Sequence, residues 1–161
     1  MGTKKTPGDD TGEAVAAMGR GDLDSVLGFH IRLAHGAVYR HFSETFAELG
    51  LTQKQVSVLW MAANRPGLSQ SDLGQELQMD RATTTDIINR LAARGLLRRV
   101  PSAKDRRKTA LFLEPEGKAL LTKAQKAIDA HESWLKCRFT PAEVDTLIGL
   151  LDRIHSQPVP N

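Results

Sequence analysis

Apolar residues recur at helical spacing over most of this 161-residue chain. Between residues 23 and 49 the pattern predicts one long helix, and Gly50 would end it because glycine easily adopts the left-handed conformation of a helix end. Thr52, Ser69 and Asp80 each precede a further helical pattern, and their side-chain oxygens suit the N-cap position. We therefore expect three more helices, over residues 53–63, 70–77 and 81–94.

Two short apolar runs flank a charged turn in the next segment. They are LLRRV at residues 96–100 and TALFL at residues 109–113, around PSAKDRRK, and this pattern predicts a β-hairpin. Pro115 and Thr140-Pro141 then open two more helices, because proline suits the first position of a helix. Only residues 78–80 separate the second and third of the capped helices, which is helix-turn-helix spacing. A hairpin directly after such a pair is a wing, so we expect a mainly α-helical fold with a small β-hairpin wing.

The pattern divides the chain into three parts. Residues 1–21 lack apolar periodicity and are expected to form a flexible N-terminal arm. Residues 51–114 form the expected winged helix-turn-helix lobe, flanked by helical regions at residues 22–50 and 115–156. These regions carry apolar stripes that one small lobe cannot bury, so we expect them to form the interface of a homodimer. The stripes comprise Leu23, Leu27, Ile31, Leu147, Ile148, Leu150, Leu151 and Ile154.

Composition excludes several classes of protein. Hydrophobic residues make up 40% and charged residues 25% of the chain, as in soluble globular proteins. No apolar run reaches the roughly 18 residues of a membrane span, and the first residues lack the apolar core of a signal peptide. We therefore expect a cytoplasmic protein without a membrane partner. The single cysteine, Cys137, rules out an internal disulfide and a multi-cysteine metal site, and we expect a buried or incidental thiol.

Basic residues concentrate in one segment of the chain. Residues 81–108 contain nine basic and two acidic side chains, a net charge of +7, which leaves −4 for the rest of a chain whose total is +3. This segment indicates a polyanionic partner. A solvated basic face without a partner is the alternative.

The helix expected at residues 81–94 contains three consecutive threonines, although threonine is a mediocre helix former. A helical wheel gives it an inner face made of Thr84, Ile87, Ile88 and Leu91. Its outer face is small and polar and comprises Ala82, Thr85, Asp86, Asn89 and Ala93. Small side chains would let the backbone approach closely, as it must when a helix enters the major groove of DNA.

On this interpretation Thr85 and Asn89 contact base edges in the groove. The flanking phosphates would be contacted by Arg81, Thr83 and Arg90. The alternative is that the threonines only crowd the first turn of the helix, where their hydroxyls help to satisfy free backbone donors. Asp86 has three interpretations: it accepts from a cytosine amine, pairs with Arg90 four residues on, or repels unsuitable sequences.

The turn of the hairpin offers a second contact with DNA. A ribbon beside the groove helix can reach the adjacent minor groove, where arginine is attracted by concentrated negative potential. Arg106 and Arg107 are the candidates, with Lys104 and Lys108 near the DNA backbone. Asp105 would orient an arginine through a charge-assisted hydrogen bond. A hydrophilic surface turn is the alternative.

These residues carry a resemblance to a known family. The segment RATTTDIINRLAARGLLRRVPSAKDRRKTALFLEPEGKALL resembles the signature of the MarR family of multiple-antibiotic-resistance-type regulators. The similar features are the Arg-x-Thr start, the Gly95-Leu96 stop and the Asp105-Arg106-Arg107 wing, and the likeness extends over about residues 23–155. One departure is Glu114-Pro115, where the family usually has a threonine cap.

The resemblance implies a winged-helix homodimer in which the first, fifth and sixth helices interlock. Such dimers mostly repress transcription from a palindromic operator, with groove helices about 34 Å apart, and a small ligand releases them from DNA. By similarity, Arg107 enters the minor groove and Asp105 orients it. The ligand of the family is often a phenolic or aromatic carboxylate.

Several side chains could bind such an anionic ligand. In GFHIRLAHGAVYRHF, and in the helix that follows, aromatic and basic residues accompany an apolar face. An aromatic acid or a larger acyl-CoA thioester would suit an apolar pocket with a few cations. The candidates are His30, His35, Tyr39, Arg40 and Trp60. The alternative is that they are interface histidines and surface arginines.

Other functions are disfavoured by missing motifs. The chain has no His-Glu-x-x-His, no phosphate-binding glycine loop and no Gly-x-Ser-x-Gly, so we expect no enzyme, no cofactor and no metal site. His131 and Cys137 alone do not make a zinc site. A nonspecific nucleoid-type DNA-binding protein and a winged-helix module that binds protein are the remaining alternatives to a ligand-responsive repressor.

Overall fold

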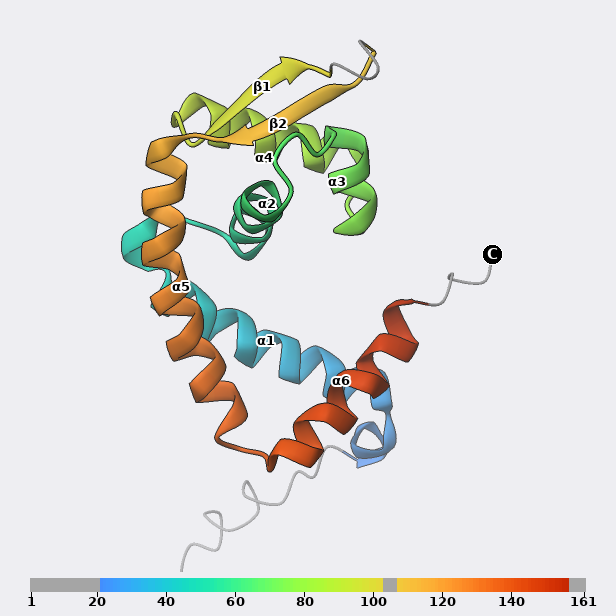
Figure 1. Cartoon of the computed structure of the whole chain (residues 1–161). Coiled ribbons are helices and arrows are strands. Elements are labelled where there is room, and N and C mark those ends of the chain that lie inside the picture. The colour runs from blue at the N-terminus through green and yellow to red at the C-terminus, as the bar shows by residue number, and fades with distance from the viewer. Residues whose placement is uncertain (1–20, 103–106, 157–161) are drawn as a thin grey trace, which may run out of the picture. The chain divides into compact units, whose positions relative to one another are not determined.

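The computed structural model of the protein describes residues 21–102 and 107–156, which form two compact units that meet between Tyr39 and Arg40. The first unit contains the 3-10 helix η1 (Gly21–Ser25) and the start of α1 (Leu27–Thr45). The second contains the end of α1 and all later elements (Figure 1).

The expected single helix over residues 23–49 is wrong at both ends. The chain forms η1, then α1, and then a second 3-10 helix, η2 (Ala47–Leu49). At the first break the Ser25 hydroxyl donates to the carbonyl of Asp22 at 2.8 Å. At the second break Phe46 leaves helical geometry and is buried in the core, with 1% of its surface exposed. Gly50 has a φ of 57° and ends this region as predicted.

The three capped helices begin where the sequence predicts. They are α2 (Gln53–Asn64), α3 (Gln70–Glu76) and α4 (Arg81–Ala93), and each ends within one residue of its expected end. Thr52 forms a capping box with Gln55, while Ser69 and Asp80 accept hydrogen bonds from backbone N–H groups three residues later. These caps satisfy donors that the first turn of a helix leaves without partners.

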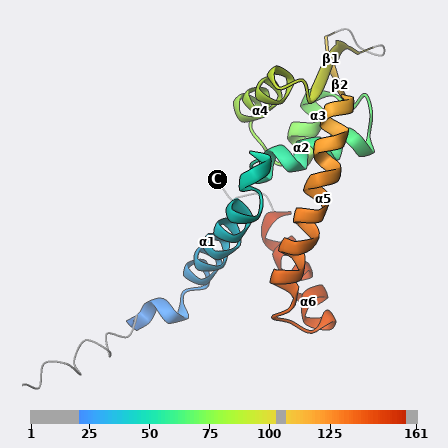
Figure 2. The same ribbon diagram turned by 90° about the vertical axis from the view of Figure 1, so that its left-hand side faces the viewer.

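The predicted hairpin consists of the antiparallel strands β1 (Leu97–Pro101) and β2 (Thr109–Leu113), with Leu97 opposite Leu113. Two backbone hydrogen bonds tie β2 to the segment before α3. Gly67 N donates to Leu111 O at 2.8 Å, and Leu111 N donates to Leu68 O at 3.0 Å. Both ribbon views place the hairpin beside α3 and α4, which contact β2 and β1 respectively (Figures 1 and 2).

The last two helices are α5 (Pro115–Lys136) and α6 (Pro141–His155). As expected from the sequence, Glu114 gives α5 no side-chain cap, and its carboxylate instead accepts a 2.8 Å hydrogen bond from Arg98. Near the start of α5, Gly117 lies against the carbonyl of Leu96, in a space that a Cβ atom would overfill. The close approach fixes the junction between hairpin and α5.

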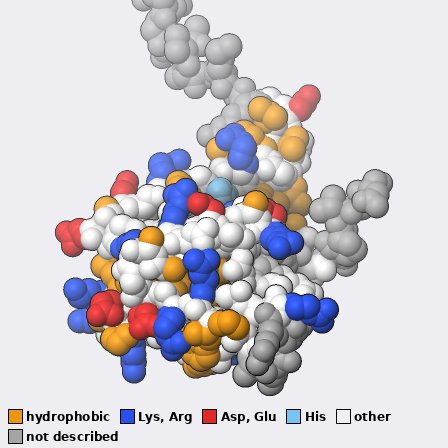
Figure 3. Space-filling model, turned by 90° about the horizontal axis from the view of Figure 1, so that it is seen from above, with side chains coloured by type: hydrophobic (Ala, Val, Ile, Leu, Met, Phe, Trp, Pro, Cys, Tyr) orange, Lys and Arg blue, Asp and Glu red, His pale blue; other side chains and the backbone are white. Residues whose placement is uncertain are grey.

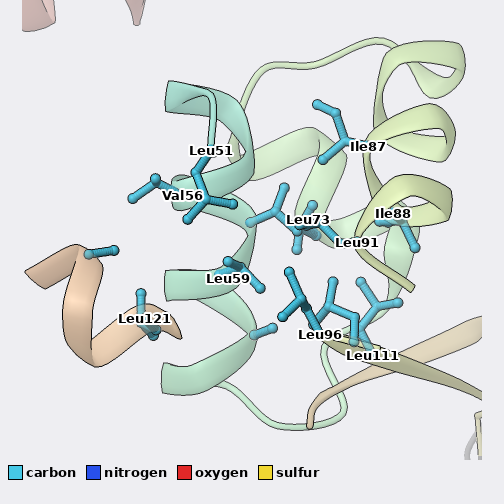
Figure 4. Packing of buried hydrophobic residues seen from close by; sticks show 14 of the residues in the cluster. Leu51, Val56, Leu59, Leu73, Ile87, Ile88, Leu91, Leu96, Leu111 and Leu121 are labelled. Carbon is cyan, nitrogen blue, oxygen red and sulfur yellow. The ribbon is translucent and has the colours of Figure 1, made fainter. Parts of the chain in front are cut away.

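The hydrophobic core surrounds α2, which contacts α4, α5 and β2. Leu59 of α2, Ile88 and Leu91 of α4, and Leu111 of β2 have no exposed surface. Figure 4 shows these side chains pointing toward one another across the lobe. By contrast, α6 has no buried residue within the described structure, and its large apolar side chains lie exposed.

Within residues 21–102 and 107–156, no helix has the length and apolarity needed to cross a bilayer.

Candidate nucleic-acid interface

The inner face of α4 is anchored as the helical wheel predicts. Thr84, Ile87, Ile88 and Leu91 are all buried. A Cβ atom on Gly74 of α3 would meet the Thr84 hydroxyl at 2.8 Å, so the two helices approach each other closely there. The anchored inner face leaves the opposite face exposed, including Arg81, Ala82, Asp86, Asn89 and Arg90.

All three threonine hydroxyls of α4 have partners within the protein. Thr83 donates to the Asp80 carboxylate at 2.6 Å, Thr84 to the Asp80 carbonyl at 2.8 Å, and Thr85 to the Arg81 carbonyl at 2.7 Å. The hydrogen bonds from the side chain and the backbone of Thr83 hold the pKa of Asp80 below its ordinary value. Each hydroxyl therefore donates to an oxygen atom near the first turn of α4, whereas the alternative drawn from the sequence had the hydroxyls accept from free backbone N–H groups. Base contact by Thr85 stays a prediction.

Two other side chains of the outer face are held by neighbours. Arg90 pairs with Asp86 at 3.0 Å, which is one of the three interpretations of this aspartate. Asn89 Oδ1 accepts a 2.7 Å hydrogen bond from Nη1 of Arg99, a residue of β1 that belongs to the basic segment but was not predicted to contact DNA. In addition, Gln70 Nε2 of α3 donates to the Thr85 hydroxyl oxygen at 2.8 Å.

A cavity of about 480 Å³ lies between α3, the start of α4 and β2. Arg81, Arg107 and Lys108 line it, and Lys108 pairs with Asp72 at 3.2 Å. Hydrogen bonds from Ser69 and then Lys108 keep the pKa of Asp72 below its ordinary value. Three cationic side chains around one hollow suit an anion such as a backbone phosphate of DNA.

Arg107 of the predicted wing contact is exposed. The other wing candidates, Lys104, Asp105 and Arg106, lie outside the described residues. Figure 3 views the protein from the hairpin side and shows Lys and Arg side chains over much of this face, with several acidic side chains among them.

The ligand candidates are distributed over both units. In the first unit His35 stacks on Tyr39 with ring centroids 6.2 Å apart, and His30 Nε2 lies 2.9 Å from the Asp24 carbonyl oxygen. In the second unit Arg40 and Trp60 are exposed. None of the five lines the cavity beside α3.

The structure contains a histidine pair that the sequence pattern did not predict. Nδ1 of His41 lies 2.8 Å from Nδ1 of the buried His131, and the His41 ring stacks on Trp134 at 3.9 Å. Burial and then the neighbouring His41 lower the pKa of His131, while Glu132 opposes them. Ninety positions separate the two histidines, so no local pattern could have linked them.

Cys137 is exposed, so the first of the two expectations, a buried thiol, is wrong, and the second, an incidental thiol, stays a prediction. It is the C-cap of α5, and its Sγ donates to the Trp134 carbonyl at 3.2 Å. Across the described part of the chain, the structure gathers no group of three His, Cys, Asp or Glu side chains that could hold a metal ion.

Comparison with known proteins gives consistent matches. The model of the MarR family matches residues 51–109. A protein of Thauera aromatica, named as a transcriptional regulatory protein for the hcr operon, is 34% identical over 155 residues, which cover 96% of this chain and 93% of that protein.

Solved structures agree with these matches. The transcriptional repressor CouR bound to a 23-mer DNA duplex has a TM-score of 0.81 and 30% identity, over 86% of this chain and 98% of that chain. CouR bound to p-coumaroyl-CoA has a TM-score of 0.79 and 28% identity, over 88% of this chain and 99% of that chain. The chain has a winged helix-turn-helix lobe and matches these relatives over most of its length. It therefore belongs to the MarR family of transcriptional regulators.

Proposed function

We propose that this protein is a homodimeric repressor that binds a palindromic operator through α4 and the wing, and that a small anionic ligand releases it. The single observation that carries the proposal is the outer face of α4. This face is exposed, small and polar, and basic side chains border it. A helix with such a face can approach base edges in the major groove, while neighbouring cations contact phosphates.

The proposed contacts divide by position on the lobe. Asn89 and Thr85 face the bases, whereas Arg81, Thr83 and Arg90 lie where they would meet the flanking backbone. Arg107 belongs to the wing, together with Lys104, Asp105 and Arg106. The cavity lined by Arg81, Arg107 and Lys108 would accept a phosphate between helix and wing.

We assign dimerisation to residues 22–50 and 115–156. Leu147, Ile148, Leu150 and Leu151 of α6 are between 39% and 52% exposed, and Leu27 of α1 is 69% exposed. Apolar surface on this scale is usually covered by a partner, and a second copy of the chain would cover it by two-fold symmetry.

We propose an aromatic acid or its CoA thioester as the releasing ligand, with His30, His35, Tyr39, Arg40 and Trp60 as candidate contacts. The CouR relative was solved with p-coumaroyl-CoA, which supports this class of ligand. We assign the protein no catalytic activity, and we expect it to act on DNA in the cytoplasm. A nonspecific DNA-binding protein is the second candidate, because the basic face alone would bind any duplex.

Selection of bound DNA from a random pool tests the proposal. We expect an enriched palindrome, and its affinity should exceed that of random DNA by roughly a thousandfold or more at physiological salt. Equal affinity for both DNAs would favour the nonspecific alternative. Addition of 4-hydroxybenzoate or p-coumaroyl-CoA should weaken operator binding, whereas free coenzyme A should not.

A charge-matched pair of variants tests the interface itself. Arg81→Ala should reduce the slope of log affinity against log salt by about one. Lys126→Ala, which removes an exposed positive charge from α5, should leave the slope unchanged. Equal slopes for Arg81→Ala and the parent protein would remove Arg81 from the interface.

A further inference from the structure

The outer face of α4 is completed by a side chain from another element. Arg99 lies on β1 and is exposed, and its Nη1 donates to Asn89 Oδ1 at 2.7 Å. A guanidinium has donors and no acceptor, so the Asn89 atom that faces it must be the amide oxygen. The amide NH₂ of Asn89 is therefore on the other branch of the side chain, away from this hydrogen bond.

The neighbouring arginine shows that this placement is specific to Arg99. Successive residues of a strand point to opposite faces. Arg98 pairs with Glu114 at 2.8 Å and lies over the Phe112 ring at 5.0 Å. Arg98 thus packs against β2 and the start of α5, whereas Arg99 reaches α4. Because Asn89 is neutral, the hydrogen bond that holds Arg99 does not neutralise its charge.

The pair has a surplus of hydrogen-bond donors. Asn89 retains the two donors of its NH₂ group and one lone pair, and the guanidinium retains the donors that Asn89 does not use. Guanine presents two acceptors, O6 and N7, in the major groove, whereas adenine presents one acceptor and one donor. A donor-rich pair is therefore complementary to guanine. An asparagine acting without Arg99 would be free to bind adenine through both amide atoms.

We propose that Arg99 contacts a guanine of the operator in the major groove, and that Asn89 positions its guanidinium for this contact. The inference rests on the proposed function, because it requires α4 to enter the groove. Arg99 then determines specificity from the first strand of the hairpin, outside the helix that the sequence identified as the base-contacting element.

DNA selection with four proteins tests the assignment. The parent protein should enrich a palindrome with an invariant guanine in each half-site. Arg99→Ala should lose preference at that one position and keep the rest of the motif, and Asn89→Ala should weaken the same preference. Arg98→Ala is the matched control, since it removes the same charge from the adjacent residue, and its motif should equal that of the parent.

Binding to a defined duplex gives the second measurement. Replacement of the guanine by adenine should weaken binding of the parent protein roughly fivefold to a hundredfold, the usual range for a bidentate base contact. Substitution by 7-deazaguanine, which lacks the N7 acceptor, should also weaken it. Arg99→Ala should bind the three duplexes with nearly equal affinity.

The possible failures are distinguishable. If the parent protein enriches no motif, the proposed function fails and this assignment fails with it. If the parent enriches a motif whose guanine survives Arg99→Ala, only the role of Arg99 is overturned. If Arg99→Ala lowers the affinity for all three duplexes by the same factor, its preference for guanine is unchanged. Arg99 would then contact the DNA backbone, and this outcome would also refute the proposal. Circular dichroism of each variant confirms that it is folded.

Discussion

Replacement of Gly117 by alanine should destabilise the junction between the hairpin and α5. A Cβ atom built on Gly117 comes closer to the Leu96 carbonyl oxygen than the 3.0 Å below which real Cβ atoms are essentially never found, and it lies 2.9 Å from Leu113 Cδ1. The nearest atom belongs to the backbone, so no side chain can rotate to relieve the overlap. Either α5 or the backbone at Leu96, just before β1, must move.

Three effects set the size of the change. Overpacking of this kind costs about 1–3 kcal/mol. Displacement of Leu96 also weakens the 3.1 Å hydrogen bond that its carbonyl accepts from Glu114 N. A hydrogen bond of this kind contributes about 1 kcal/mol to stability. The higher helix propensity of alanine offsets this loss by roughly 1 kcal/mol. We therefore expect Gly117→Ala to lower the free energy of unfolding by about 2 kcal/mol.

Urea-induced unfolding, followed by circular dichroism at one protein concentration, measures this difference. Lys118→Ala is the control, because Lys118 is the next residue of α5 and its side chain is exposed. This control should be at least as stable as the parent. A Gly117→Ala protein that matches the parent in stability would refute the close approach of α5 to Leu96.

Two further predictions concern the core and the histidine pair. Leu59 has no exposed surface, so Leu59→Ala should lower the free energy of unfolding by about 2–5 kcal/mol. Leu59→Met should lower it by less than about 1.5 kcal/mol. Similar losses for both variants would argue against tight packing around α2. The pKa of His131 is lowered in the folded protein, whereas an ordinary histidine has a pKa of about 6.5. Just below that pH the unfolded chain therefore binds more protons than the folded one, and the free energy of unfolding should fall as the pH drops. His131→Asn should reduce this fall, measured as the change in urea midpoint between about pH 7.5 and about pH 5.5, and an unaltered fall would assign the effect to other groups.

Local sequence signals predicted most element positions in the lobe. Thr52, Ser69 and Asp80 cap helices because the cap needs only an oxygen and the N–H groups that follow it in the chain. The apolar spacing of α4 likewise predicted its buried face, because helical geometry alone decides which residues share a side. The break at Phe46 was missed, since the helix ends there so that the ring can enter a core made by distant segments.

For the candidate interface, the sequence predicted which side chains of α4 face outward but not what holds them. Arg99 meets Asn89, and Gln70 meets Thr85, across gaps that depend on how the hairpin and α3 pack against α4. The cavity has the same origin, because Arg81 and Lys108 come together only in the folded lobe. Contacts between elements follow from tertiary packing, and periodicity within one element carries no information about them.

The two backbone hydrogen bonds that join Leu111 to Gly67 and Leu68 bear on how such a protein could evolve. They use only main-chain atoms, so they do not depend on which side chains the turn between β1 and β2 carries. Mutations in that turn could therefore change which DNA sequences are favoured without loosening β2 from the segment before α3. A duplicated gene could in this way acquire a new set of target promoters through few substitutions, while the scaffold stays constant.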